Sequence, residues 1–331
     1  MTCVGLLAGC AFGLSAAAAS AATLQGAGST LVAPIEAEWA AAFDSATGNT
    51  VTYNSVGSGT GEKNIAAGLV DFGASDAPLS SYSNVPGNLV QIPWALTATG
   101  ISYHLHGVPR LHLDGGIVAK IYLGVVKNWN DPQIAHENPG VRLPNLPITV
   151  FWRSDGSGDT YAFTRYLSSV SGSFRTRVGN STTVSWPVGQ GRKGNTGLAQ
   201  AIAQTNGGFA YIAVSYLIAD NLPAVSVRNA AGRYIVPNLS AISAAAKIVH
   251  SVPANNEVQI VNPPASARSA YPISTFTYVI LPTNPSQGST LKSFINYALT
   301  GGQQFGPRLD FAPLPSGVKN AALATLNRIS G

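Results

Sequence analysis

Three short segments rich in glycine, serine and threonine contain the residue types that bind a small oxyanion. They are GAGST (26–30), GSGTG (57–61) and DGSGDT (155–160). Each precedes a helical pattern, so each offers free backbone N–H groups and a hydroxyl at a helix N-terminus, where the helix dipole favours negative charge. A single segment of this kind is most often ordinary N-capping by serine or threonine. Three in one chain predict an anion site, provided that the fold brings them together.

Two charged residues narrow the identity of the anion. Arg153 lies just before the third segment and could bind an anion through two parallel N–H bonds. Asp76 would repel an anion unless that anion carries a proton to donate, as phosphate does near neutral pH and sulfate does not. A buried carboxylate acceptor therefore admits hydrogen phosphate and rejects sulfate, which would leave it unpaired at a cost of about 1–3 kcal/mol or more. Each residue alone is also compatible with a surface arginine or a turn aspartate.

Alternating strand-like and helical segments surround these residues. Helical spacing occurs in 33–43, 61–69, 160–167 and 197–204, and strand-like composition occurs in 51–56, 70–73, 148–152 and 209–214. The alternation predicts an α/β fold with helices packed on a sheet. Proline-bearing connections are expected near Pro86–Pro93 and Pro263–Pro264.

The composition indicates a globular chain without metal or cofactor chemistry. Of 331 residues, 45% are apolar and 10% are charged, which argues against disorder. The net charge of +5 comes from basic residues that are mostly scattered singly, so nucleic-acid binding is not expected. Both cysteines, Cys3 and Cys10, lie in the first ten residues and leave the rest of the chain without a disulfide or a thiolate metal site. Three clustered histidines, His104, His106 and His112, lack a paired carboxylate motif and are expected at the surface.

The first 21 residues have the pattern of an export signal. An apolar run from Val4 and an alanine-rich stretch lead to Ala19-Ser20-Ala21, a small-x-small cleavage site. No lysine or arginine precedes the apolar run, so Met1 could be an internal start. A lipoprotein processing box at Leu7–Cys10 is the second alternative and a buried N-terminal helix the third. No later apolar stretch approaches the ~20 residues that span a bilayer, so we expect an exported, periplasmic protein that is not integral to the membrane.

At these segments the chain resembles the periplasmic phosphate-binding proteins of phosphate-specific ABC importers, a family of type II solute-binding proteins. The matching segments follow the family order across nearly the whole chain after the leader: GAGSTLVAP (26–34), VGSGTGEKNIAAGLVDFGASDAPLS (56–80), IYLGVVKNWNDPQIAHENPG (121–140), RSDGSGDTYAFTRYL (153–167), WPVGQGRKGNTGL (186–198), GGFAYIAVSYL (207–217) and YPISTFTYVIL (271–281). GAGST, DFGASDAPLS and RSDGSG together form a highly specific signature.

The resemblance implies a two-lobed type II periplasmic-binding fold, each lobe a mixed sheet flanked by helices, with the ligand in the cleft between them. One lobe would use both ends of the mature chain, residues 22–96 and 269–331, and the other would use residues 97–268. The resemblance also implies a monomeric, non-enzymatic protein that captures inorganic phosphate and hands it to the permease subunits of an inner-membrane ABC importer. An exported phosphatase or other hydrolase that uses the same oxyanion cleft is the alternative.

Matching of the motifs carries the family's phosphate contacts to a set of residues in this chain. They are Thr30, Leu31, Ser58, Asp76, Arg153, Ser157, Gly158 and Asp159. The resemblance implies that Asp155 orients Arg153 by a salt link, and Thr160 lies next to the contacts. Leu31 stands where the family often has phenylalanine, but the contact there comes from a backbone N–H.

Asp159 departs from the family pattern, in which a threonine donates both its N–H and its hydroxyl to phosphate. Here the backbone N–H remains, but the side chain is an acceptor near an anion. In one arrangement Asp159 turns away and acts as a charge at the helix N-terminus, with Thr160 supplying a hydroxyl. In the other, Asp159 accepts a second proton from phosphate. We expect the first arrangement.

Two other motifs suggest different chemistry and are weaker. The glycines of GQGRKG (189–194) match the dinucleotide-binding pattern, but no acidic residue follows about 20 residues further on. Ser157 between two glycines resembles a nucleophile elbow, but Asp155 breaks the G-x-S-x-G pattern. The chain also offers no obvious metal cluster or base for a phosphatase. We therefore expect a binding protein.

Overall fold

The computed structural model of the chain describes residues 21–331. The predicted export signal over 1–21, together with both cysteines and the lipoprotein box, lies outside the described residues except for Ala21. Within the described part, no helix is both long enough and apolar enough to cross a bilayer.

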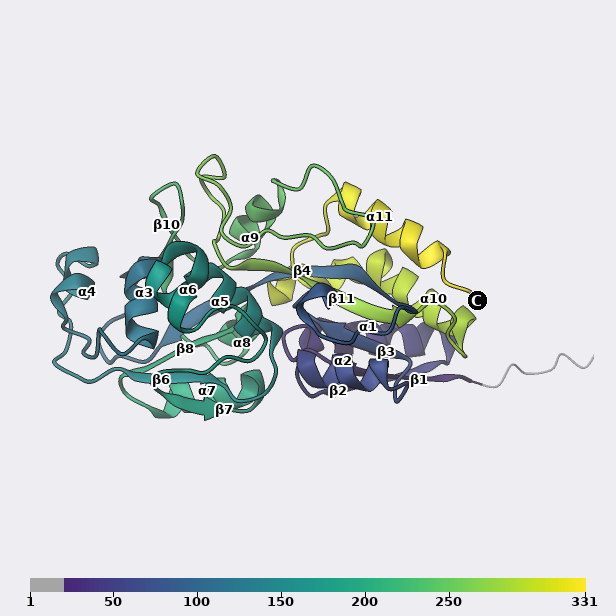
Figure 1. Ribbon diagram of the computed structural model, residues 1–331, viewed down its shortest axis with the longest axis horizontal. Helices are drawn as coiled ribbons and strands as arrows, with labels where there is room; N and C mark the ends of the chain where they lie inside the picture. Colours follow the sequence, from purple (N-terminus) through teal and green to yellow (C-terminus); the bar gives the residue numbers. More distant parts are fainter. Residues whose placement is uncertain (1–20) are drawn as a thin grey trace, which may run out of the picture.

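One large sheet runs through the molecule with the strand order β2-β1-β3-β11-β4-β8-β6-β7 (Figure 1). Its strands are β1 (Thr23–Gly28), β2 (Thr50–Ser55), β3 (Phe72–Ser75), β4 (Leu89–Tyr103), β6 (Thr149–Arg153), β7 (Gln190–Arg192), β8 (Gly208–Ala213) and β11 (Ser274–Pro282). A small sheet contains β5 (His112–Leu113), β9 (Ser226–Arg228) and β10 (Tyr234–Ile235). Parallel strand pairs β1–β2, β1–β3 and β6–β8 are connected through helices, so the predicted α/β class is confirmed.

Strand β4 joins two halves of the large sheet. Its first part, Leu89–Ala98, pairs antiparallel with β11, and its last part, Thr99–Tyr103, pairs antiparallel with β8. The first part therefore belongs to a lobe with β1, β2, β3 and β11, and the last part to a lobe with β6, β7 and β8. Figure 1 shows these two groups of strands next to each other with β4 running between them. The lobe boundaries after residues 96 and 268 stay a prediction.

Pro93 lies inside β4, where the sequence predicted a connection. Tyr278 of β11 pairs with Pro93 and Thr277 pairs with Ala95, so the register steps over Trp94 in a bulge. A bulge removes the need for a ladder N–H at the proline, which is why the strand continues through it. The predicted connection over 86–93 is therefore wrong for its second half, because β4 begins at Leu89.

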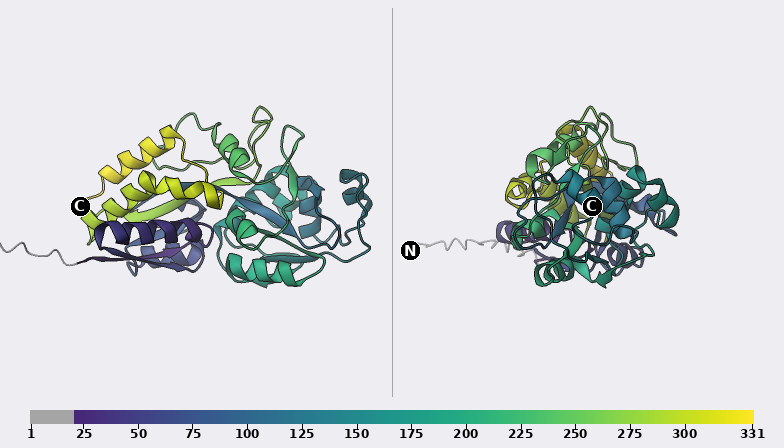
Figure 2. Two further views of the ribbon diagram at one scale, coloured as in Figure 1. Left: turned by 180° about the vertical axis from the view of Figure 1, so that it is seen from behind. Right: turned by 90° about the vertical axis from the view of Figure 1, so that its left-hand side faces the viewer.

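Helices flank both lobes (Figures 1 and 2). The first lobe carries α1 (Ala33–Thr47), α2 (Ser58–Ala66), α10 (Gly288–Leu299) and α11 (Ser316–Asn327). The second lobe carries α3 (Gly115–Tyr122), α4 (Pro132–Glu137), α5 (Gly158–Val170), α6 (Gly172–Arg177), α7 (Gly194–Gln204) and α8 (Val214–Ala219). Helix α9 (Leu239–Ala246) packs on β4 and β11, and the short 3-10 helices are η1 (Leu79–Ser81) and η2 (Gly301–Leu309).

Helix α1 follows directly from its sequence. Pro34 lies in the first turn, where its missing N–H is not needed, and Gly48 ends the helix with a φ of 72°. Ile35, Trp39 and Phe43 recur every four residues and bury one face of the helix. The packed face fixes the helix, and therefore its N-terminus, against the first lobe.

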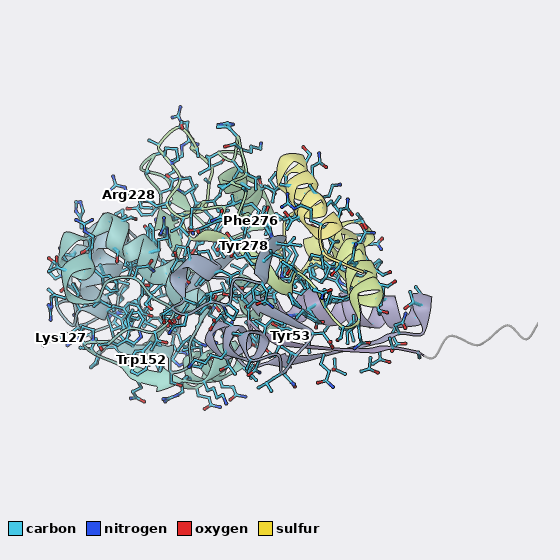
Figure 3. All side chains as sticks on the ribbon, turned by 45° about the vertical axis from the view of Figure 1, so that its right-hand side comes forward. Tyr53, Lys127, Trp152, Arg228, Phe276 and Tyr278 are labelled. Carbon is cyan, nitrogen blue, oxygen red and sulfur yellow. The ribbon has the colours of Figure 1, made fainter. Side chains whose placement is uncertain are left out.

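Each lobe has its own aromatic core. In the first lobe the Trp39 and Trp94 ring centroids lie 5.0 Å apart, and in the second Phe163 stacks on Tyr211 at 4.5 Å. Figure 3 shows dense side chains throughout both lobes, with Tyr53 of β2 in the first. The buried apolar residues of the two lobes nevertheless form one continuous core, so the residues that meet at the site are carried by lobes packed against each other.

Candidate functional site

The first glycine-rich segment follows β1 and brings Ser29 to Asp76. Gly28 has a φ of 149°, and a Cβ there would lie 2.1 Å from the carbonyl oxygen of Ala74, so this approach of β1 to β3 requires glycine. Ser29 Oγ donates a hydrogen bond to Asp76 Oδ2 at 2.6 Å and accepts one from Leu31 N at 3.0 Å. Because Asp76 directly follows β3, the β1–β3 pair positions the first segment and this carboxylate together.

The second and third segments touch each other across the two lobes. Gly59 N donates to the Gly156 carbonyl oxygen at 3.0 Å, and Gly158 N donates to Ser58 Oγ at 3.1 Å. A Cβ on Gly158 would lie 2.4 Å from the Cβ of Asp76, so the third segment approaches Asp76 this closely because residue 158 is glycine. The three segments, far apart in sequence, converge as an anion site requires.

Arg153, at the end of β6, is held from two sides. Its Nε and Nη2 donate to the two oxygens of Asp155 at 2.8 and 2.5 Å, and its Nη1 donates to Asp159 Oδ2 at 3.2 Å. The Asp155 pair fixes the plane of the guanidinium. Burial alone would raise the pKa of Asp155, but the hydrogen bonds and charge of Arg153 lower that pKa below its ordinary value. Asp155 therefore stays ionised near neutral pH.

Asp159 points inward, contrary to the expectation that it turns away from the site. The residue is 1% exposed, and its Oδ1 accepts from Thr99 Oγ1 at 2.8 Å while its Oδ2 accepts from Asn195 Nδ2 at 2.8 Å. Thr160 does not take over the missing hydroxyl, because its Oγ1 lies 2.6 Å from the Tyr211 hydroxyl. The physical reason is the set of donors around Asp159, which satisfies a buried carboxylate better than the helix end would.

Asn195 links the two lobes and was not among the predicted site residues. Its Nδ2 donates to Thr30 Oγ1 and to Asp159 Oδ2, both at 2.8 Å, and its Oδ1 accepts from Ala213 N at 3.0 Å. Its position at the start of a helical pattern in a family-matching segment was a weak signal. Thr99, in the interior of a strand, gave no signal at all.

Burial makes ionisation of both site carboxyls unfavourable. It raises the pKa of Asp76 to about 8, with the charge of Asp159 adding to the effect and the Ser29 hydrogen bond opposing it. Burial also raises the pKa of Asp159, against the opposing positive charge of Arg153. Each carboxyl therefore favours a shared or bound proton at this site.

All eight predicted contact residues are buried. They are Thr30, Leu31, Ser58, Asp76, Arg153, Ser157, Gly158 and Asp159. Ser157 accepts a hydrogen bond from Thr160 N at 3.3 Å, so its hydroxyl hydrogen is free to donate to a ligand. Hydroxyls, N–H groups at helix starts and one guanidinium, combined with carboxyl acceptors, suit an oxyanion that carries protons.

Sequence comparisons identify the family of the chain. A model of the PBP superfamily domain matches residues 15–301. A phosphate-binding protein PstS from Haemophilus influenzae is 36% identical over 306 residues, which is 91% of each chain. Another from Pasteurella multocida is 34% identical over 324 residues, covering 96% of this chain and 94% of the relative. The chain belongs to the PstS phosphate-binding proteins of the PBP superfamily.

Solved structures define the fold of this PstS-family chain. A high-affinity periplasmic phosphate-binding protein, PfluDING, with bound phosphate aligns with a TM-score of 0.72 at 21% identity, covering 91% of this chain and 93% of that one. A phosphate-binding protein from Stenotrophomonas maltophilia aligns with a TM-score of 0.67 at 22% identity, covering 92% and 94%. The predicted two-lobed type II fold is confirmed. The PstS relatives are named as binding proteins and not as enzymes, so the phosphatase alternative has no support.

The segment 189–194, whose glycines match the dinucleotide-binding pattern, has a structural role in this PstS-family chain. Gln190–Arg192 forms β7, an edge strand parallel to β6, where a dinucleotide pattern would need a strand-to-helix turn. Gly194 N donates to Asp155 Oδ1 at 3.0 Å and so helps to hold the partner of Arg153. Over residues 21–331, no group of three or more His, Cys, Asp or Glu side chains could hold a metal ion.

Proposed function

We propose that this chain captures inorganic phosphate between its two lobes and passes it to the permease subunits of an ABC importer. The observation that carries the proposal is the buried Asp76 carboxyl near Arg153, at the meeting point of three helix N-termini. Helix N-termini and a guanidinium favour an anion, and the carboxyl accepts a proton that phosphate carries and sulfate lacks. The names of the curated relatives, phosphate-binding protein PstS, support the same ligand.

Each site residue has a distinct part in this proposal. Phosphate oxygens accept from the hydroxyls and N–H groups of the three segments, namely those of Thr30, Leu31, Ser58, Ser157, Gly158 and Asp159. In this proposal the N–H groups of Leu31 and Gly158 exchange their bonds to Ser29 Oγ and Ser58 Oγ for bonds to the anion. Arg153 supplies the positive charge and two-pronged donation. Asp76 accepts the proton of the bound anion, while Asp155 acts through Arg153 by fixing the guanidinium plane.

The periplasm is the place of action that fits this proposal. A receptor for an inner-membrane importer acts outside the cytoplasm, and the export pattern over 1–21 agrees with that location. Anchoring through a lipid on Cys10 is the second option. A monomer suffices, because one chain supplies all of the contacts from both lobes. The lobe boundaries after residues 96 and 268 belong to the same proposal.

A binding titration combined with a turnover assay tests the proposal. The purified chain is expected to bind inorganic phosphate with saturation at one anion per chain and to leave a chromogenic phosphate ester intact. Arg153→Ala is expected to abolish binding. A folded wild-type protein that binds no phosphate would overturn the proposal, and sustained hydrolysis of the ester would replace it with a phosphatase.

A further inference from the structure

Asp76 and Asp159 reach the proposed phosphate site from opposite lobes. Asp76 follows β3 of the first lobe, and Asp159 lies in the first turn of α5 in the second. Gly158 lies between them, with its Cα against Asp76 and Asp159 as its chain neighbour. Arg153 Nη1, at 3.2 Å, and Asn195 Nδ2, at 2.8 Å, both donate to Asp159 Oδ2. The two carboxyls therefore border the same point of the cleft.

Asp159 is oriented by its neighbours without being saturated by them. Three donors reach its two oxygens, from Thr99, Arg153 and Asn195. An ionised carboxylate has about four acceptor positions, so one remains, on Oδ1, for a proton of the ligand. Thr99 and Asn195 are positioning residues, since they act on the ligand through the direction that they give to Asp159.

The charges around this point do not favour a doubly charged anion. Asp155 and Asp159 bond to the guanidinium of Arg153, whose charge also acts on Asp76, so one positive charge faces three carboxyls and the fully ionised group is negative before any anion enters. Asp155 stays ionised because its pKa is lowered by Arg153. Neutralisation must therefore come from protons on Asp76, on Asp159 or on the anion.

We propose that Asp76 and Asp159 act as a pair that binds phosphate through two protons, one directed to each carboxylate, and that Asp159 sets this requirement. The requirement rests on the proposed function, because it concerns the ligand of the same cleft. The ligand class is an oxyanion that presents two O–H groups in the complex. Sulfate, which presents none, is excluded by both carboxylates.

The proton count of the complex follows from the pair. Above neutral pH, free phosphate is mostly doubly charged and brings one proton, which is donated to one carboxylate. The second proton comes from the free carboxyl pair, or from solvent once the pair has lost it, and no covalent bond is made or broken. Burial raises the pKa of Asp76 to about 8, so above this pH each bound phosphate must take up a proton. Binding is therefore expected to weaken as the pH rises further.

Other ionisable groups face this pair from every neighbouring element. They are Arg153 and Asp155 at the end of β6, Tyr211 of β8, Tyr216 of α8, Tyr53 of β2, Tyr82 after η1, Glu36 of α1 and Glu62 of α2. Burial raises the pKa of each of these tyrosines, so they stay neutral through the titration. Arg192 of β7 is directed to the Phe151 ring, 5.0 Å from its centroid. Glu36 and Glu62 are present in the wild type and in the variants of Asp159. A difference in the pH dependence of phosphate binding between these proteins therefore comes from the Asp76–Asp159 pair.

The test compares the wild type with Asp159→Asn and Asp159→Thr in calorimetric titrations with inorganic phosphate. The wild-type Kd is expected to rise about fivefold or more from about pH 8 to about pH 9, with uptake of about one proton per phosphate at the upper pH. Proton uptake is measured from the heats in two buffers of different ionisation enthalpy. In both variants Asp76 alone takes the proton that the anion brings, so the Kd should change less than about twofold. Asp220→Asn makes the same charge change at an exposed position and should keep the wild-type slope.

Several outcomes would overturn the proton requirement. A wild type that binds phosphate with a pH-independent Kd and no proton uptake refutes it, and so does an equal slope in the wild type and both Asp159 variants; either result leaves the proposed function intact. A folded wild type that binds no phosphate at any pH removes the proposed function and the proton requirement together. If one Asp159 variant does not fold, the other variant and the wild-type proton uptake still decide.

Discussion

Replacing Arg153 by lysine keeps the positive charge but removes the planar set of donors. In the wild type, Nε and Nη2 hold Asp155 at 2.8 and 2.5 Å, and Nη1 reaches Asp159 at 3.2 Å. An ammonium is a point charge on a flexible stem and cannot reproduce this fork. We expect the lysine ammonium to pair with one of the two carboxylates, so that phosphate loses the hydrogen-bond donors of the guanidinium.

The size of the effect follows from the bonds that are lost. At least two charge-assisted hydrogen bonds disappear, each worth about 1.5–3 kcal/mol, so phosphate affinity should fall about 10²- to 10⁴-fold. Stability should also fall by up to about 3 kcal/mol, because a buried ion pair is disrupted. The folded-state pKa of Asp155 is lowered, so the stability that it contributes is present above its unfolded pKa and is lost as the pH falls through the folded value. The stability difference between wild type and variant should therefore shrink in acid.

Calorimetry with phosphate measures the affinity. Urea unfolding at about pH 7 and at about pH 2.5, which lies below the unfolded pKa of an aspartate, measures the stability. Arg228→Lys is the matched control, because Arg228 is exposed on β9 of the small sheet, which carries none of the predicted contact residues. A Kd for Arg153→Lys within about threefold of the wild-type value would refute the assignment of the guanidinium to the anion. A stability loss that grows in acid would refute the part given to Asp155.

Three further substitutions test other parts of the structure. Burial raises the pKa of Glu36 to about 8, so the wild type loses stability as the pH rises from the unfolded pKa through this value. Glu36→Gln should therefore be more stable than the wild type by up to about 5 kcal/mol in alkaline urea unfolding and equal to it in acid. A stability difference that is the same at both pH values would contradict this. Gly158→Ala puts a Cβ 2.4 Å from the Cβ of Asp76. It should weaken phosphate binding about tenfold or more and leave the circular dichroism spectrum unchanged. An unchanged affinity would show that the two lobes need not approach this closely. Ser29→Ala removes a donor to Asp76 and should cost about 1–3 kcal/mol of phosphate binding in calorimetry, whereas a neutral effect would show that another donor replaces it.

The elements around the site could be predicted because they depend on local patterns. The four-residue recurrence of Ile35, Trp39 and Phe43 fixes α1, and the glycine-rich turns mark the beginning of each helix that faces the cleft. Helix α7 begins at Gly194, three residues before the predicted start at 197, because Gly194 adopts a φ of 68° that admits an earlier turn into the helix. The local sequence predicts a break at Pro93 because the compensating bulge depends on pairing with a distant strand, β11.

The direction of Asp159 could not be predicted from its neighbours in the chain. Its donors Asn195 and Thr99 lie 36 and 60 residues away in the sequence, on other elements of the same lobe, so they reach Asp159 only through the tertiary packing of that lobe. The local pattern is that of an acidic residue in the first turn of a helix, where an outward charge is favourable. Tertiary hydrogen bonds outweigh that local preference, as they do for most buried carboxylates.

The selectivity of the wild type between phosphate and sulfate tests phosphate recognition most directly. In competition titrations at about pH 9, where a pKa of about 8 leaves Asp76 mostly ionised, phosphate is expected to bind about 10²-fold more tightly than sulfate or better, because sulfate leaves the ionised acceptors unpaired next to an anion. Asp76 and Asp159 both contribute to this rejection. Equal affinity for the two anions, or tighter binding of sulfate, would contradict recognition through the protons of phosphate.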